Sequence, residues 1–484
     1  MVFSSALFLV IFLPVFLIVY YVLPYKVKNL WILLASITFY AWGAPNFVYI
    51  VLGSIIADFY LVKYIGRSGR TKKRWLIGLS LTLNIGLLAY FKYANFFVEN
   101  FNSLLNSLGM EHAAWTAIAL PIGISFFTFQ KITYSVDVYR NIHQPLKKIT
   151  DYAMYILMFP HLIAGPIVRF NLIADQIEDR RYNETIDNRL SGFFRFIIGL
   201  SKKVLIANVL GAEVDRIFAI DTAMMSSAQA WTGIIAYAFQ IYFDFSGYSD
   251  MAIGLAKMIG FTFPENFNNP YISQNITEFW RRWHMTLGRF MREYLYIPLG
   301  GNRVQPVRLY FNLWLVFLLS GLWHGAAWNF VAWGAFHGFF LIADRLFLVR
   351  LLSRLGKVPS ITFTFFVTLI GWVLFRSESL SYSIGYLDTM FSFAGQSDAG
   401  EFGLKFWMIL GVAALFSFMA MFKGNEDWQM KALSNWTIGQ LDNWTGRTFW
   451  FSGGWKLLFS ILFFVLCLAA VISSGFNPFI YFRF

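Results

Sequence analysis

The sequence predicts an all-α polytopic membrane protein, and both its composition and the clustering of its apolar residues indicate this class. Only 13% of the 484 residues are charged, whereas 58% are hydrophobic and 20% are aromatic. A soluble domain usually carries about 25% charged residues, so this chain lacks the polar surface that water requires. Apolar runs that approach or reach the ~20 residues needed to cross hydrocarbon recur along the chain, which excludes a single soluble core.

These apolar runs predict roughly eleven transmembrane helices, together with shorter re-entrant or interfacial segments. The clearest runs cover residues 6–23, 30–43, 46–62, 75–91, 190–212, 311–322, 326–343, 361–375, 405–421 and 456–474. The first run is interpreted as a span because no basic residue precedes it and no small-residue cleavage site follows it. No repeat or low-complexity linker divides the chain. We therefore expect one membrane domain, residues 1–484, that ends in a short aromatic tail at 475–484.

The net charge of +13 is typical of basic cytoplasmic loops. The loop at 63–74 is densely basic and the loop at 43–45 is not, which predicts an outside N-terminus with the first and third loops in the cytoplasm. Beyond residue 135 both 140–148 and 169–190 are charged, so either an intervening segment is re-entrant or one charged loop faces out. The charge also suits an anionic substrate at the cytoplasmic face. We expect contact with membrane lipid and no nucleic-acid partner.

The segment Ser320–Gly325 places a histidine, His324, between two strongly apolar runs. Glycines on both sides thin the helix and would let another backbone or a ligand approach. Because histidine titrates near neutrality, it is a common general base for activating a hydroxyl. The alternative is a histidine satisfied by a neighbouring helix, but the glycines and the surrounding aromatic residues favour a functional role.

A second candidate region runs from Glu278 to Arg303. Its aromatic and apolar residues recur at steps of three and four, which predicts one amphipathic helical face, while Arg281 and Arg282 fall off that stripe. Two interpretations stay open: the arginines anchor the helix to lipid headgroups, or they meet the phosphates of a bulky cofactor with His284 near the reaction path. The residues predicted to bind that cofactor are Arg281, Arg282, Trp283, Asn302 and, from a third region, Asp244.

The third region, Tyr242–Asp250, carries two carboxylates at membrane depth, where each charge is costly. Asp244 and Asp250 are six residues apart and would not share one face of a straight helix. A broken helix that lines a tunnel is therefore the expectation. His161, in the proline-rich segment Phe159–Pro166, is expected to have a structural role. His337 is expected to pack against aromatic rings, and Cys467 to be an inert packed thiol.

Several sites of ordinary chemistry are missing from the sequence. It has no phosphate-binding glycine loop, no metal-binding His/Glu pair and no serine-elbow motif. These absences argue against ATP-driven transport and ordinary serine hydrolysis, and no metal site is expected.

Residues 242–303 and the Gly-Leu-Trp-His-Gly around His324 resemble the membrane-bound O-acyltransferases, the MBOAT family. The similarity is closer to the bacterial branch that contains alginate O-acetyltransferase. The segments Met1–Ser5, Phe91–Asn95 and Phe159–Pro166 extend it over most of the chain. The resemblance implies a ring of tilted helices around a central tunnel. It places His324 at the invariant histidine of the family and His284 at a second, more variable position.

The resemblance also implies a reaction and its partners. The donor would be a cytoplasmic acyl-CoA such as acetyl-CoA, used as a substrate rather than held as a cofactor. His324 would accept the proton of an attacking hydroxyl, and the acyl group would leave on the outer side of a bacterial cell membrane. There a separate SGNH-type or similar acetyltransferase would place it on an exported polysaccharide.

The hydroxyl that attacks is suggested by the aromatic tail. This tail resembles the C-terminal peptide of the small partner in the D-alanylation system, so Tyr481 is predicted to carry the acyl group. The alternative is that the tail is an interfacial aromatic anchor. Three further hypotheses stay open for the whole protein: D-alanyl transfer to teichoic acid from a carrier-protein thioester, a transporter without chemistry, and a non-catalytic scaffold.

Overall fold

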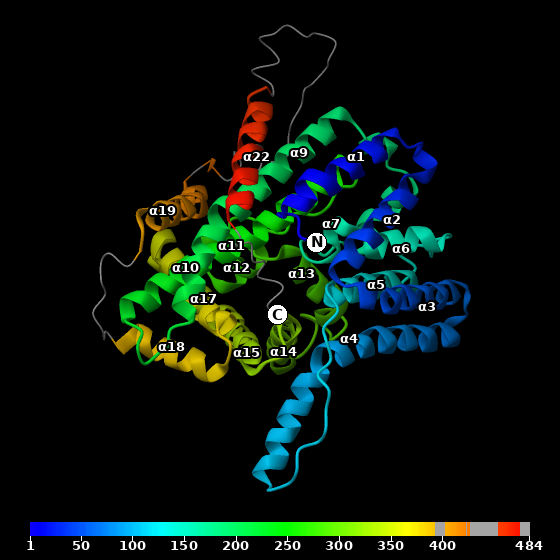
Figure 1. Cartoon of the computed structure of the whole chain (residues 1–484). Coiled ribbons are helices and arrows are strands. Elements are labelled where there is room, and N and C mark those ends of the chain that lie inside the picture. Colours follow the sequence, from blue (N-terminus) through cyan, green and yellow to red (C-terminus); the bar gives the residue numbers. More distant parts are fainter. Residues whose placement is uncertain (393–401, 423, 426–453, 475–484) are drawn as a thin grey trace. The chain divides into compact units, whose positions relative to one another are not determined.

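The computed structural model of the chain describes residues 1–392, 402–422, 424–425 and 454–474, and every regular element in these ranges is a helix (Figure 1). The predicted all-α class is therefore confirmed. Tyr481 lies outside the described residues. Six helices in the described part are long and apolar enough to cross a membrane: Pro45–Arg67, Arg70–Ser107, Pro306–His324, Lys357–Arg376, Leu404–Met421 and Trp455–Ser473.

Some of the other predicted runs form shorter or interrupted helices. Residues 326–343 give a helix of 16 residues, and residues 190–212 are divided by a π-helical segment, Lys202–Ala207. Length and composition thus identify six candidate spans among the described residues. The predicted number of roughly eleven crossings stays a prediction.

Two compact units make up the chain, and the first comprises Met1 and residues 10–180. Its helices are α1 Leu13–Val22, α2 Tyr25–Gly43, α3 Val48–Arg67, α4 Arg70–Ser107, α5 Ile124–Tyr139, α6 Ile149–Leu157, α7 Phe159–Leu162 and α8 Phe170–Glu178. A buried carboxylate on α3, Asp58, accepts hydrogen bonds from Ser80 and Asn84 of α4 at 2.8 and 2.9 Å, and a third from Tyr152 of α6. These bonds satisfy a charge that would otherwise be costly inside an apolar span.

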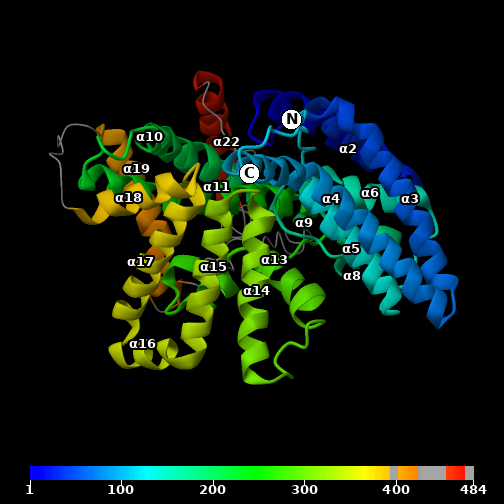
Figure 2. The same cartoon turned by 90° about the horizontal axis from the view of Figure 1, so that it is seen from below.

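The second unit comprises residues 2–9 and the chain from Arg181 onward. Its helices are α9 Ile186–Ser201, α10 Asn208–Phe218, α11 Ser227–Met258, α12 Ile276–Arg282, α13 Met285–Phe290, α14 Pro306–His324, α15 Trp328–Ala343, α16 Val349–Leu355, α17 Lys357–Arg376, α18 Leu380–Ser392, α19 Leu404–Phe418 and α22 Trp455–Ser473, with π-helical segments η4 Lys202–Ala207, η6 Met291–Tyr296 and η7 Asp344–Leu348. Within this unit α15 packs between α14 and α17 (Figure 2).

Helices α9 and α11 touch through their backbones. A Cβ atom built on Gly199 would lie 2.4 Å from the Gly247 carbonyl oxygen, and one on Gly254 would lie 2.5 Å from the Gly192 carbonyl oxygen. Only glycine permits these approaches, because any larger side chain would force the helices apart. The close crossing brings basic residues of α9 and η4 against the carboxylates of α11.

The expectation of a broken helix at 242–250 is wrong, because α11 runs without interruption from Ser227 to Met258. The physical reason is that its carboxylates are neutralised from the side. The Lys203 ammonium lies 2.6 Å from Asp244, and the Arg195 guanidinium lies 2.6 Å from Asp250. With their charges paired, the carboxylates can remain buried on a regular helix.

Candidate active site

His324 is the last residue of α14, and its ring is held in one orientation by its own helix. Its Nδ1 atom lies 2.7 Å from the carbonyl oxygen of Ser320, one turn earlier. A carbonyl oxygen can only accept a hydrogen bond, so Nδ1 carries the proton. The lone pair of the neutral imidazole therefore falls on Nε2, which is the atom able to act as a base.

The ring of His324 is buried among aromatic side chains. Its centroid lies 4.8 Å from Trp323, 5.0 Å from Trp333 on α15 and 5.4 Å from Phe375 on α17, and each pair meets edge to face. Such a buried aromatic environment has a lower local dielectric than water, which strengthens electrostatic interactions inside the site. The predicted close approach at the neighbouring glycine is confirmed, since a Cβ atom on Gly321 would lie 2.2 Å from the Phe330 carbonyl oxygen.

His284 lies at a sharp break between α12 and α13. Its backbone is left-handed, with φ 42° and ψ 52°, a conformation that costs energy for a residue other than glycine. The predicted continuous amphipathic helix is therefore wrong, because it is divided into α12, α13 and η6. The break has a physical cause: the loop before α12 binds the backbone of this turn, with the Met285 amide donating to the Asn266 carbonyl oxygen at 2.9 Å.

The side chain of His284 is 1% exposed, and its two nitrogens have different surroundings. Nδ1 lies 3.0 Å from the Asn266 carboxamide oxygen, whereas Nε2 has no hydrogen-bond partner among the described residues. A buried nitrogen without a partner is unusual, which makes His284 a candidate functional residue.

The two histidines lie close together in the second unit. The ring of His284 is 6.2 Å from that of Trp323, the residue before His324. Burial, followed by the neighbouring His324, lowers the pKa of His284 well below its ordinary value. His284, which lies outside the six candidate spans, is therefore neutral at physiological pH, so one ring nitrogen keeps a lone pair that can accept a hydrogen bond.

The residues predicted to bind a cofactor do not all share one environment. Arg281 and Asn302 are exposed, and Asn302 accepts a hydrogen bond from the Tyr296 hydroxyl at 2.7 Å. Arg282 is half-buried and lies 2.9 Å from Glu278. Trp283 is buried, 4.9 Å from the ring of Trp372, and Asp244 is buried in its ion pair with Lys203. Binding of acyl-CoA by these residues stays a prediction.

Three other expectations concern single residues. The expected packing of His337 against aromatic rings is confirmed, since its ring lies 4.9 Å from Trp280 and 5.0 Å from Trp333. In the first unit, His161 is buried and its Nε2 donates to the Tyr155 carbonyl oxygen at 2.8 Å, in agreement with a structural role. Cys467 is fully buried, as expected of a packed thiol.

Sequence reasoning missed Asn266, which binds both the side chain and the backbone turn of His284. The polar segment Glu265–Asn269 between two apolar runs was the available signal, because polar side chains at membrane depth require partners.

A model of the membrane-bound O-acyltransferase family matches residues 76–384, which is more than half of the chain. The chain belongs to this family. His284 and His324 both lie inside the matched range, and the chain is thus an enzyme, a membrane-bound O-acyltransferase. The resemblance noted from the motifs is confirmed.

The acyltransferase is similar to proteins with different named acceptors. It is 46% identical over 396 residues to the protein named "Probable alginate O-acetylase AlgI" of Pseudomonas aeruginosa, covering 81% of this chain and 75% of the relative. It is 39% identical over 434 residues to the peptidoglycan O-acetyltransferase of Helicobacter pylori, covering 82% and 81%. It is 26% identical over 277 residues to the teichoic acid D-alanyltransferase of Bacillus subtilis, covering 53% and 69%.

Proposed function

We propose that this acyltransferase takes an acetyl group from cytoplasmic acetyl-CoA and passes it across the bacterial cell membrane for O-acetylation of an exported polysaccharide such as alginate. The observation that carries the proposal is the buried pair of histidines. In the neutral form His324 has its lone pair on Nε2, and the Nε2 of His284 has no partner among the described residues. The similarity to relatives named as alginate and peptidoglycan O-acetyltransferases supports acetyl as the group and an envelope polymer as the acceptor.

The proposed chemistry is acyl transfer with general-base help. Nε2 of His324 accepts the proton of an attacking hydroxyl as its oxygen bonds to the thioester carbonyl carbon. The carbon–sulfur bond then breaks, its electron pair stays on the CoA sulfur, and His324 returns the proton to that thiolate. Before the attack, the single O–H of the hydroxyl donates to Nε2 of His284, which orients it, and the same proton then passes to Nε2 of His324 as the oxygen attacks. Such general-base help contributes typically about 10²–10⁴-fold to the rate.

The proposed reaction requires a membrane tunnel, a site for the CoA phosphates and a partner enzyme. In this proposal roughly eleven helices, each crossing the membrane with ~20 residues, form a ring around a central tunnel. The exposed Arg281 is proposed to meet the phosphates of CoA by charge-assisted hydrogen bonds, and the half-buried Arg282 would do so beside its ion pair with Glu278. A separate SGNH-type or similar acetyltransferase on the outer side would place the acetyl group on the polymer.

The proposed polymer is tested in the producing bacterium by deleting the gene and measuring ester-linked acetyl groups on its exported polysaccharide. We expect these groups to disappear and to return when the wild-type chain is supplied, but not when His324→Ala is supplied at equal membrane abundance. Unchanged polymer acetylation in the deletion strain would contradict the proposal.

Tyr481 is proposed to carry the acetyl group through the tunnel, as the acceptor hydroxyl. In the same strain, Tyr481→Phe removes only that hydroxyl and is expected to abolish polymer acetylation. Tyr49→Phe is the matched control, because Tyr49 is 81% exposed on α3 and far from any role in the proposal. Normal acetylation with Tyr481→Phe would leave the tail as an interfacial anchor.

D-alanyl transfer is the second candidate function, and the similarity to a teichoic acid D-alanyltransferase is the observation that favours it. That reaction would draw on a carrier-protein thioester at the cytoplasmic face. If the purified protein discharges a D-alanyl carrier-protein thioester and does not react with acetyl-CoA, D-alanyl transfer replaces the first proposal.

A further inference from the structure

The carboxamide of Asn266 gathers an unusual number of hydrogen bonds around the His284 turn. Asn266 lies in the loop between α11 and α12 and is 1% exposed. Its Oδ1 atom lies 3.0 Å from His284 Nδ1, 2.8 Å from the Thr286 hydroxyl and 3.3 Å from the Thr286 amide nitrogen. Its Nδ2 atom donates to the Ser249 hydroxyl of α11 at 3.0 Å.

These contacts determine which nitrogen of His284 carries the proton. A backbone N–H group can only donate, so the atom of Asn266 that faces the Thr286 amide is the oxygen. Because that oxygen accepts, the His284 Nδ1 atom beside it must be the donor. The lone pair of the neutral ring is therefore on Nε2, the atom that has no partner among the described residues. Asn266 thus selects the tautomer.

Asn266 also holds the strained backbone on which His284 sits. The main-chain oxygen of Asn266 accepts from the Met285 amide at 2.9 Å, while its side chain binds the next residue, Thr286. Bonds to the two residues that follow His284, together with the bond to its ring, hold the left-handed conformation of this residue.

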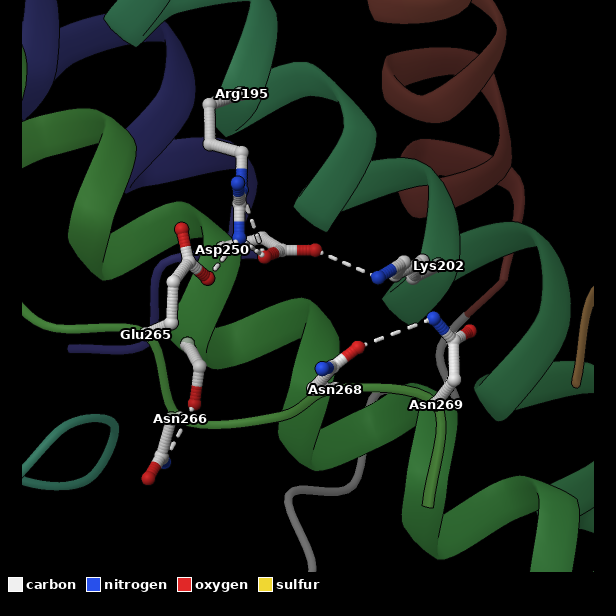
Figure 3. Close-up of polar contacts among 8 residues, drawn as sticks. Arg195, Lys202, Asp250, Glu265, Asn266, Asn268 and Asn269 are labelled. Carbon is white, nitrogen blue, oxygen red and sulfur yellow. Dashed lines mark hydrogen bonds and ion pairs between the residues drawn. The ribbon is translucent and has the colours of Figure 1, made fainter. Parts of the chain in front are cut away.

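The loop is in turn fixed to the helices by a network of buried and partly buried charges (Figure 3). Glu265, the residue before Asn266, lies 2.7 Å from the Arg195 guanidinium of α9. The same guanidinium lies 2.6 Å from Asp250 of α11, which also lies 2.7 Å from Lys202. This network ties the position of Asn266 to the close crossing of α9 and α11, so the carboxamide is a rigid acceptor rather than a mobile loop side chain.

We propose that Asn266 is a positioning residue for the acyl transfer: it sets the tautomer and the direction of the His284 ring so that Nε2 is presented to the reacting hydroxyl. This inference rests on the proposed function, in which His284 orients the hydroxyl. Asn266 itself touches no reacting atom. Its removal should therefore lower kcat and leave KM for acetyl-CoA largely unchanged, because donor binding does not involve this bond.

The test compares Asn266→Leu, which removes the acceptor, with Asn266→Asp, which keeps it at the same size. With radiolabelled acetyl-CoA and purified protein, we expect Asn266→Leu to lower kcat by at least about tenfold, within the ~10²–10⁴-fold that acid–base groups supply. Asn266→Asp should recover most of that loss. The matched control is Asn268→Leu, the same substitution two residues later in the loop. The side-chain oxygen of Asn268 accepts a hydrogen bond from Asn269 at 3.4 Å. The control variant should stay within about threefold of wild type, because the Asn268 side-chain oxygen accepts from Asn269 and not from His284.

A double-mutant cycle with His284→Ala separates positioning from a general structural effect. If Asn266 acts through His284, adding Asn266→Leu to His284→Ala should change kcat no further, since coupled residues are non-additive. Alanine replaces leucine in the same cycle if the leucine variant does not fold. If the two substitutions lower kcat by factors that multiply in the double mutant, the positioning role is overturned. An Asn266→Leu variant as active as wild type, while His284→Ala is impaired, would also overturn it. Either result leaves the proposed role of His284 intact. Full activity of His284→Ala would overturn the proposed role of His284, and this inference with it.

Discussion

Replacing His324 by alanine is expected to lower the turnover of acetyl-CoA by about 10²–10⁴-fold, the usual contribution of a general base. The substitution removes Nε2, the basic atom of a ring whose other nitrogen is committed to Ser320. The rate is measured as release of CoA by purified protein in detergent. Because His324 is 7% exposed, the unfolding temperature of the variant is measured alongside to show that the loss of rate is not a loss of fold.

A matched control for this substitution is His112→Ala. His112 is exposed in the segment that follows α4, so its removal should leave both turnover and stability unchanged. Transfer at the wild-type rate by folded His324→Ala would contradict the account. That result would favour a protein that moves an acyl intermediate without performing chemistry.

The substitution Asp250→Asn is expected to destabilise the second unit by about 3–5 kcal/mol, because breaking a buried pair leaves an uncompensated charge. Asp250 lies 2.6 Å from Arg195 and 2.7 Å from Lys202, with side-chain exposures of 6% for Asp250, 7% for Arg195 and 22% for Lys202. Arg195 keeps its contact with Glu265, so the loss should fall toward the lower end of this range. The measurement is the free energy of unfolding in detergent.

The control for Asp250→Asn is Glu213→Gln, which removes an ion pair with Arg216 on the surface of α10. Its side chains are 32% and 43% exposed, so the expected cost is only ~0–1 kcal/mol. Equal stability changes in the two variants would show that the network around Asp250 does not hold α9 against α11.

The sequence predicted most reliably the features that are determined by patterns of nearby residues. The all-α class followed from composition and run length. The close approach of another backbone near His324 followed from the glycines in its segment, since one of these, Gly321, meets the backbone of α15 in the structure. The packing of His337 followed from the apolar helix that carries it. Each of these features was predicted from a pattern of residues within a few turns of one another.

The two wrong expectations both concern partners distant in sequence. The continuity of α11 depends on Arg195, which is 55 residues before Asp250 in the chain, so no local pattern could show that the carboxylate is paired. The break at His284 depends on Asn266, 18 residues earlier. The apolar period of three and four residues continues across that break, and periodicity alone therefore predicted a single helix.

The candidate site was predictable to a similar extent. Its two histidines are conspicuous because ionisable residues between apolar runs are rare. Asn266 was missed because asparagine is common in loops and turns, where its usual role is to bind nearby backbone. Only the hydrogen bonds to His284 and Thr286 distinguish it from an ordinary loop asparagine.

The most direct test of the central claim is to incubate the purified acyltransferase with acetyl-CoA that is radiolabelled in the acetyl group. The account predicts that wild type releases CoA and that label accumulates on the protein, whereas His324→Ala does neither. Folded wild-type protein that leaves acetyl-CoA intact, but discharges a D-alanyl carrier-protein thioester, would contradict acetyl-CoA as the donor.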